Sequence, residues 1–289
     1  MTLINFFESS METKMTIEEI KTLKNIRKIT MLTAYDYPMA QAVDRAGIDI
    51  VLVGDSVANV VLGLESTKDI GMQEMLYHAK AVRRAVKRAL LVGDMPYVAY
   101  QKNINEAVKN AREFIKQAGC DAVKIEWFDK AVIVVRKIIA DGIPVMGHIG
   151  LTPQTADLLG GFKVQGKDTQ AAKKLIDQAT ELEAIGCFVI LLECVPDQVA
   201  RMITEKIKVP TIGIGAGPFC DGQVLVTHDL LGLFERHVPK FVKKYAQLMD
   251  AMTQAFINYK KDVEEGTFPS DEHSYHISEQ ELKKLLEEV

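Results

Sequence analysis

The chain has 289 residues, of which 48% are apolar and 26% are charged, and its formal net charge is −4. This balance is ordinary for a globular protein, and the absence of a basic stripe argues against a nucleic-acid-binding surface. The longest apolar stretches span only a few residues, far short of the roughly 20 that a membrane-spanning helix needs.

The N-terminal segment and the cysteines bear on cellular location. Residues 1–10 lack the basic region and the long apolar core of a secretory signal, so we expect a cytoplasmic protein. No two cysteines form a Cys-x-x-Cys pair, which favours buried free thiols over a zinc site or a disulfide framework. The four cysteines are Cys120, Cys187, Cys194 and Cys220.

Short apolar runs alternate with helical patterns along most of the chain. The runs predict eight strands, at 30–34, 49–53, 89–92, 122–125, 144–146, 188–192, 211–214 and 223–226. The helical patterns lie at 38–46, 72–87, 104–117, 130–140, 169–184 and 196–205. Gly119, Gly142 and Gly186 follow three of these helices and predict left-handed C-caps. Because no linker rich in proline or serine interrupts the alternation, we predict one closed α/β barrel, with a doubly wound open sheet as the alternative.

The ends of the chain differ from this pattern. We expect 1–20 to form a flexible N-terminal extension, 21–260 a single (β/α)8 catalytic barrel and 261–289 an acidic C-terminal tail. A basic and apolar helix is predicted over 238–259, and a final helix over 278–288.

Four of the apolar runs end in an acidic residue, namely Asp55, Asp94, Glu126 and Glu193. The carboxyl ends of barrel strands share one rim, so these side chains are expected to converge there. Converging carboxylates repel one another unless a cation or a proton lies between them. Asp55 and Asp94 each follow a glycine, and short carboxylates on a rigid backbone suit Mg²⁺. Ser56 offers a hydroxyl and an N–H to an anionic substrate, or serves as a helix N-cap.

Lys124 and Glu126 are two residues apart on one predicted strand, so their side chains share a face, which in a barrel is the interior. A buried charged pair is costly without a use. We interpret Lys124 as a fixed cation for a substrate carboxylate. A structural ion pair remains possible, as does a Schiff-base lysine, which would need a lowered pKa.

Glu193 ends the most apolar run of the chain, so burial should raise its pKa and suit it to accept a proton near neutrality. His148 follows a predicted strand and could bond a substrate, shuttle a proton or pack as an ordinary buried histidine. The glycine loop 213–217 is a weak phosphate-site signal, because such glycines equally serve tight turns. Together, Mg²⁺ on two aspartates, a lysine for a carboxylate and a glutamate base predict enolisation of a 2-oxo acid.

These residues lie in stretches that resemble the ketopantoate hydroxymethyltransferase family. The stretches run in family order and comprise 31–36, 53–56, 94–96, 123–126, 147–154, 192–196, 213–217 and 221–223. The resemblance implies a (β/α)8 barrel of the phosphoenolpyruvate/pyruvate type. It also implies transfer of a one-carbon unit from 5,10-methylenetetrahydrofolate to 3-methyl-2-oxobutanoate, giving 2-dehydropantoate in pantothenate biosynthesis.

The resemblance also implies roles for particular residues. Asp55, Asp94 and Glu126 would form the magnesium site, Ser56, Asp94 and Lys124 would contact the oxo acid, and Glu193 would be the catalytic base. Asp55 and His148 complete the expected substrate-binding set. Family members form homodecamers, which a single sequence does not reveal.

One departure from the family pattern keeps a second function open. Trp127 and Phe128 stand where the family usually has two glycines, so the loop over the site is expected to be bulkier and the folate pocket reshaped. This favours, as an alternative, a related barrel lyase or class II aldolase acting on another 2-oxo acid. A non-catalytic scaffold is the third hypothesis, and the buried charges of Lys124 and Glu126 argue against it.

Overall fold

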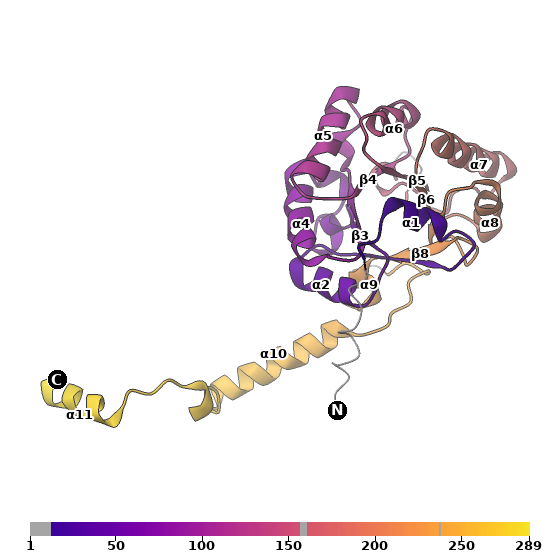
Figure 1. The fold of residues 1–289 in the computed structure, drawn as a ribbon. Helices are drawn as coiled ribbons and strands as arrows, with labels where there is room; N and C mark the ends of the chain where they lie inside the picture. The colour runs from indigo at the N-terminus through magenta and orange to yellow at the C-terminus, as the bar shows by residue number, and fades with distance from the viewer. Residues whose placement is uncertain (1–12, 157–160, 237) are drawn as a thin grey trace.

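In the computed structural model, which describes residues 13–156, 161–236 and 238–289, eight parallel strands close into a barrel surrounded by helices (Figure 1). Each strand pairs with the next in sequence, and the last pairs with the first. The closed ring confirms the predicted barrel and excludes the doubly wound open sheet. The strands are β1 (Ile29–Thr33), β2 (Ile50–Val53), β3 (Leu90–Asp94), β4 (Ala122–Glu126), β5 (Val145–Gly150), β6 (Val189–Glu193), β7 (Thr211–Ile214) and β8 (Gly222–Leu225).

In the described part of the chain, six helices cover the outside of the ring, and all six match helices predicted from the sequence. They are α2 (Tyr37–Arg45), α4 (Met72–Ala85), α5 (Ile104–Lys116), α6 (Ala131–Ala140), α7 (Thr169–Ala184) and α8 (Asp197–Lys206). The connections hold the short helices α3 (Val57–Val60) and α9 (Thr227–Leu230) and the 3-10 turns η2 (Thr67–Asp69), η3 (Tyr97–Ala99) and η4 (Pro153–Thr155). Gly119, Gly142 and Gly186 have φ values of 70°, 82° and 102°, which confirms the predicted left-handed C-caps of α5, α6 and α7.

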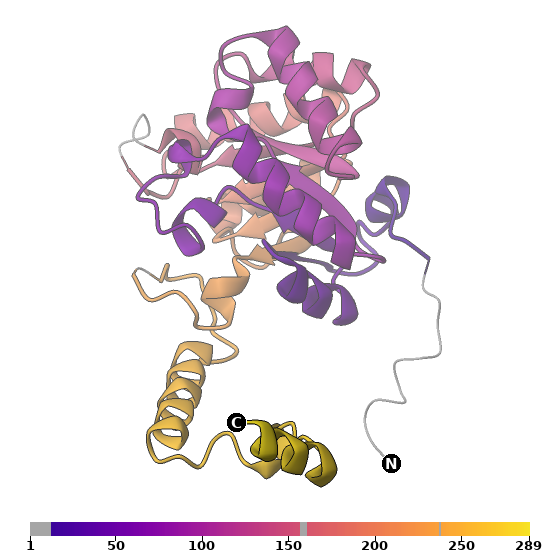
Figure 2. The same cartoon turned by 90° about the vertical axis from the view of Figure 1, so that its left-hand side faces the viewer.

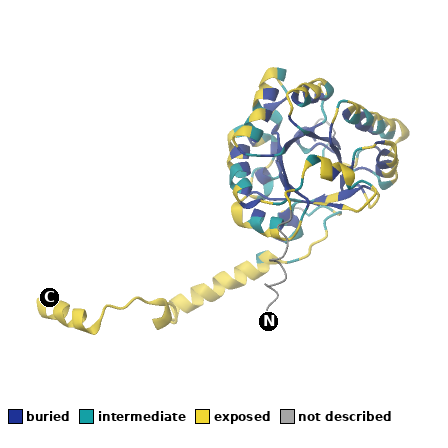
Figure 3. Ribbon diagram, viewed as in Figure 1, coloured by how far each residue is buried: buried dark blue, intermediate teal, exposed yellow. Residues whose placement is uncertain are grey.

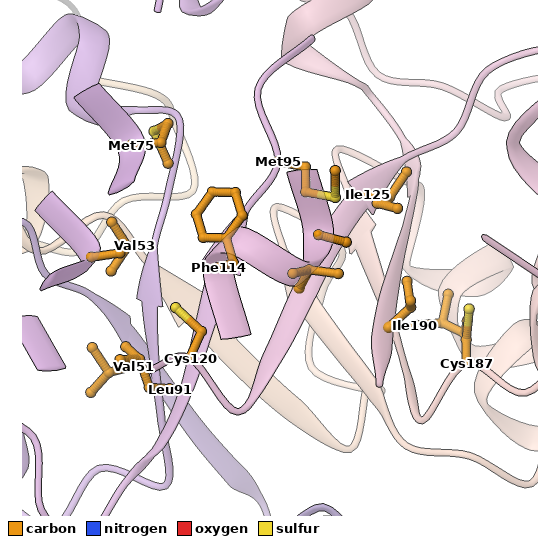
Figure 4. Close-up of a cluster of buried hydrophobic side chains, with 14 of the residues drawn as sticks. Val51, Val53, Met75, Leu91, Met95, Phe114, Cys120, Ile125, Cys187 and Ile190 are labelled. Atoms are coloured by element: carbon orange, nitrogen blue, oxygen red, sulfur yellow. The ribbon is translucent and has the colours of Figure 1, made fainter. Parts of the chain in front are cut away.

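Side chains alternate along each strand between the inside and the outside of the barrel. Val51 and Leu91 point outward and pack beneath the helices with Phe114 (Figure 4). Their strand neighbours Ile50 and Leu90 point inward and belong to a separate apolar cluster. The barrel therefore has two cores, and Figure 3 shows the buried ring that divides them.

Helix α1 (Ile17–Thr22) covers the end of the barrel where the strands begin (Figures 1 and 3). The helix starts at a capping box between Thr16 and Glu19, and its Ile20 is fully buried against the inner cluster. The prediction that 1–20 is a flexible extension is therefore wrong for this helix, because the apolar inner core needs a cover. Residues 1–12 lie outside the described part of the chain.

After β8 and α9, the chain leaves the barrel. Helix α10 (Leu248–Glu264) has no buried residue and extends away from the ring (Figures 1 and 2). It begins at Leu248, so the predicted helix over 238–259 started too early, and a barrel boundary at 260 would cut α10. The turn η5 (Asp271–His273) and helix α11 (Glu279–Glu288) follow, and α11 confirms the predicted final helix. Within the described ranges, no helix has the length and hydropathy needed to cross a bilayer.

Candidate active site

A pocket of about 650 Å³ opens at the carboxyl ends of the strands. All of the predicted site residues line it: Asp55, Ser56, Asp94, Lys124, Glu126, His148 and Glu193. They come from the turn after β2 and from the four consecutive strands β3 to β6. The convergence on one rim that the four strand-end acids predict is therefore confirmed.

The register of the sheet explains which side chains become neighbours. Asp94 on β3 lies beside Lys124 on β4, and Glu126 on β4 lies beside His148 on β5. Laterally paired residues of a parallel sheet point to the same side, so each pair enters the barrel together. His148 lies within β5 rather than after it, because that strand continues to Gly150 and not only to residue 146.

Lys124 occupies the centre of the cluster and is almost completely buried. Its Nζ lies 2.9 Å from Asp94 Oδ1, 3.2 Å from His148 Nδ1 and 3.9 Å from Glu126 Oε1. Burial alone would lower the pKa of Lys124, but the surrounding carboxylates outweigh it and raise that pKa. The lysine therefore stays charged, which argues against the Schiff-base alternative.

The pKa values of two carboxyl groups beside Lys124 are also raised, which for an acid favours the neutral form. Burial raises the pKa of Asp94 to about 7, with Lys124 opposing the shift and Asp55 adding to it. Burial also raises the pKa of Glu126 well above its ordinary value, again against the effect of Lys124. One lysine does not compensate several buried carboxyl groups, so burial favours the protonated forms of Asp94 and Glu126.

The backbone fixes the position of Asp94. Its Oδ2 accepts a hydrogen bond of 3.0 Å from the backbone N–H of Asp55, which joins the ends of β2 and β3. The preceding Gly93 faces outward onto Phe114, and a Cβ at Gly93 would lie 2.4 Å from that ring. The glycine before Asp94 therefore lets α5 pack tightly behind the site.

Carboxyl oxygens of the pocket that lack a hydrogen-bond partner indicate whether these residues suit a metal ion. Asp55 Oδ2 and Glu126 Oε1 are buried and accept no hydrogen bond, an arrangement that is costly unless a cation or a donor meets them. In the described part of the chain, no three His, Cys, Asp or Glu side chains form a ready-made metal cluster. Mg²⁺ does not need one, since it keeps several waters and takes one or two carboxylates. The donor set therefore fits a hydrated Mg²⁺.

Glu193 lines the same pocket, at the end of β6. Burial raises its pKa to about 8, in the direction predicted from its apolar strand, with Lys124 opposing and Asp55 reinforcing the shift. Its side chain keeps 16% exposure, and its Oε2 lies 3.3 Å from His148 Nε2. The carboxyl group is thus held near a second titratable group and open to the pocket.

His148 lies between Lys124 and Glu193 and is neutral. Burial, reinforced by the charge of Lys124, holds its pKa well below the ordinary value. An ammonium group can only donate hydrogen bonds, so His148 Nδ1 accepts from Lys124. The remaining proton then resides on Nε2, the nitrogen that faces Glu193.

The backbone after Glu193 is strained. Cys194 has a φ of 48°, a left-handed conformation that is uncommon for residues other than glycine. Its N–H donates to Ile214 O at 2.9 Å, and its carbonyl accepts from the N–H of Gln165 at 2.8 Å. These bonds hold the turn that ends β6 and sets the position of Glu193.

Ser56 does not act as a helix cap. It precedes α3, but its side chain makes no capping hydrogen bond. Its Oγ instead lies 2.7 Å from the hydroxyl of Tyr35, which is buried beneath the pocket rim. The serine is therefore oriented by a tyrosine that the sequence analysis gave no role.

Gln154 is a second supporting residue that the sequence analysis missed. It is fully buried, and its backbone N–H donates to Glu126 Oε2 at 3.1 Å. Its side chain bonds the carbonyl of Met95 and the hydroxyl of Tyr100, so it connects the ends of β3 and β4. Both Tyr35 and Gln154 lie in the family-like stretches, which was the available signal.

Two expectations about the pocket are not met. Trp127 and Phe128 pack against the core between barrel and helices, and neither lines the pocket. They therefore do not reshape it, and the alternative lyase or aldolase loses its motivation. Gly215 and Gly217 also lie outside the pocket lining; a Cβ there would meet Phe241 at 2.6 Å and Asp197 at 2.3 Å. Close packing, not phosphate binding, explains these glycines.

Comparison with solved structures places the barrel among known folds. The chain is similar to a phosphoenolpyruvate phosphomutase from Streptomyces platensis, with a TM-score of 0.59, 14% identity and coverage of 94% of this chain and 98% of that one. The chain is also similar to a 2,3-dimethylmalate lyase of the phosphoenolpyruvate mutase/isocitrate lyase superfamily, with a TM-score of 0.57, 14% identity and coverage of 93% of each chain. These likenesses confirm the (β/α)8 barrel fold.

Sequence comparison identifies the family. A family model described as ketopantoate hydroxymethyltransferase matches residues 14–271. A 3-methyl-2-oxobutanoate hydroxymethyltransferase of Syntrophomonas wolfei is 53% identical, covering 94% of this chain and 99% of that relative. A relative of the same name from Syntrophobacter fumaroxidans is 54% identical, covering 95% of this chain and 98% of that relative. The chain therefore belongs to the ketopantoate hydroxymethyltransferase family, and it is a hydroxymethyltransferase enzyme.

Proposed function

We propose that this enzyme transfers a one-carbon unit from 5,10-methylenetetrahydrofolate to 3-methyl-2-oxobutanoate in pantothenate biosynthesis. With one water, the products are 2-dehydropantoate and tetrahydrofolate. The observation that carries the proposal is the buried Lys124 in one pocket with Asp55, Asp94, Glu126 and Glu193. This arrangement suits an anionic substrate that must lose a proton from carbon.

The oxo acid is held by groups that complement its charge. Lys124 provides a fixed positive charge for the carboxylate, and Ser56, oriented by Tyr35, provides a hydroxyl. Asp55 and Asp94 would hold Mg²⁺ with Glu126 close by. When bound, the ion supplies charge stabilisation for the enolate that forms.

Glu193 accepts the proton from C3 of the oxo acid. Its pKa of about 8 lies close to neutrality, where a base combines a useful unprotonated fraction with sufficient basicity. His148 Nε2 lies 3.3 Å from Oε2 of the same carboxyl group. The electron pair left at C3 then forms the new carbon–carbon bond with the methylene carbon of the folate. Both C–N bonds of that carbon break in the overall reaction: the water supplies the hydroxyl group, and the nitrogens take up protons to give tetrahydrofolate.

Proton exchange at C3 tests the first half of this reaction. In D₂O, NMR should show deuterium entering C3 with Mg²⁺ present and not with EDTA, and 2-dehydropantoate should form when the folate is added. Asp55→Ala and Asp94→Ala should abolish both exchange and Mg²⁺ binding by calorimetry, whereas Asp69→Ala, an exposed aspartate on η2, should leave both unchanged. Absence of exchange in Mg²⁺ would overturn the assignment of this oxo acid.

We also propose a homo-oligomer, with the decamer implied by the family resemblance. The exposed apolar side chains of α10 support it, because a soluble monomer rarely leaves so many on one helix. They include Met252, Phe256, Ile257, Tyr259 and Val263. A cytoplasmic location stays a prediction from the sequence.

A further inference from the structure

The two carboxyl oxygens of Glu126 have different surroundings. Oε2 accepts a hydrogen bond of 3.1 Å from the backbone N–H of Gln154, whereas Oε1 is buried and accepts none. Oε1 lies 3.9 Å from Lys124 Nζ, which is beyond hydrogen-bond distance. The carboxyl group is therefore held through one oxygen, and the other oxygen is left for a ligand of the pocket.

The position of that N–H depends on the side chain of Gln154. This side chain is fully buried, its Nε2 donates to the carbonyl of Met95 at 3.1 Å, and its Oε1 accepts from the hydroxyl of Tyr100. Tyr100 is also buried, and burial, reinforced by the charge of Glu126, holds its pKa well above the ordinary value. The hydroxyl therefore keeps its proton and remains a donor to Gln154.

Phe128 packs against the ring of Tyr100. The two ring centroids lie 5.3 Å apart at an interplanar angle of 54°, within the range of favourable aromatic pairs. Phe128 stands where the family usually has a glycine, which has no ring to make this contact. The neighbouring Trp127 instead borders a surface groove beside α7. Phe128, Tyr100 and Gln154 thus form one series of contacts, which we name the Tyr100 network.

We infer that the Tyr100 network positions Glu126 for Mg²⁺ by keeping its Oε1 apart from Lys124. This inference rests on the proposed function. Without the network, the carboxyl group can rotate towards Lys124, and each charge then compensates the other. Glu126 becomes unavailable to the ion, and the oxo acid loses part of the positive charge that holds its carboxylate. Hydrogen-bonded groups behind metal-site residues set metal affinity in this way.

The affinity for Mg²⁺, measured by calorimetry with 3-methyl-2-oxobutanoate present, tests the inference. Tyr100→Phe removes one hydroxyl and keeps the ring, and the Kd for Mg²⁺ should rise about tenfold. At saturating Mg²⁺, its rate of C3 exchange should return to within about twofold of the wild-type rate, because Glu193 and Lys124 are unchanged. Thr204→Val is the control for stability. It removes a buried hydroxyl that bonds the carbonyl of Ala200, and it should lower the melting temperature without changing this Kd.

Phe128→Ala and Trp127→Ala form a matched pair, since each removes one aromatic ring from neighbouring half-buried positions. The Kd for Mg²⁺ should rise about threefold in Phe128→Ala. It should stay at the wild-type value in Trp127→Ala and in Phe128→Tyr, which keeps the ring. An unchanged Kd in either Tyr100→Phe or Phe128→Ala, or equal shifts in Phe128→Ala and Trp127→Ala, would overturn the inference. Absence of both Mg²⁺ binding and C3 exchange in the wild type would instead refute the proposed function.

Discussion

The two ends of the barrel interior have opposite chemistry, although the same eight strands build both. Where the strands begin, Ile20 of α1 closes a fully apolar cluster that includes Ile29 and Ile50. Where they end, Asp94 and Lys124 are just as buried but charged or titratable. The change from one to the other occurs within single strands, as from Ala122 to Lys124 on β4.

The two ends of the barrel interior differ in whether their side chains stabilise the fold or serve the reaction. A buried isoleucine contributes about 1.5–3 kcal/mol to folding, whereas a buried charge costs several kcal/mol unless its partners compensate. The raised pKa values of Asp94, Glu126 and Glu193 record that cost. The apolar end therefore stabilises the barrel, and the charged end is retained for chemistry. Substitutions at the two ends should affect different measurements.

The largest expected effect is the loss of catalysis in Glu193→Gln. The amide cannot accept the C3 proton, so C3 exchange measured by NMR should fall by about 10³-fold. Binding of the oxo acid should persist, and the melting temperature should not fall, because a neutral side chain suits the buried position. Glu181→Gln on the exposed face of α7 is the control and should leave exchange unchanged. Substantial exchange in Glu193→Gln would show that another group is the base.

The converse substitution is Ile20→Ala at the apolar end. It removes a fully buried side chain from beneath the strands, and the free energy of unfolding should fall by about 2–4 kcal/mol. The exchange rate of the folded enzyme should stay near the wild-type value, because the pocket is at the other end. Ile26→Ala, at a position that is 73% exposed, should change stability little. Chemical denaturation measures the free energy of unfolding of both variants. Comparable losses in Ile20→Ala and Ile26→Ala would refute the covering role of α1.

A third expected effect is the pH dependence of stability that Glu193 introduces. Its pKa in the folded protein is about 8, above the ordinary value of 4.5, so the folded state binds this proton more tightly than the unfolded state. The stability it contributes is present below pH 4.5 and is lost as pH rises towards 8.

Glu193→Gln lacks this titration while keeping Asp94 and Glu126. Its advantage over wild type in free energy of unfolding should therefore grow between pH 5 and 8, by up to about 1.4 kcal/mol per pH unit. Denaturation of both proteins at several pH values measures the difference. A constant difference would mean that the pKa of Glu193 is not raised.

Much of this architecture was predictable because it depends on local pattern. Short apolar runs located all eight strands, and the two-residue spacing of Lys124 and Glu126 placed both side chains inside the barrel. The apolar run before Glu193 predicted the direction of its pKa shift. The pocket positions of the seven candidate residues were thus predictable, while their roles stay predictions.

Other features depended on contacts between segments far apart in the chain. Packing of Ile20 against the strands turned an expected flexible extension into a helix, and packing turned Trp127 away from the pocket. The proton on His148 Nε2 follows from the position of Lys124 on the neighbouring strand. Sequence by itself determined which residues face inward, because alternation along a strand is local. Only the tertiary structure decided which of them touch, because strand register and barrel closure set distances between residues remote in sequence.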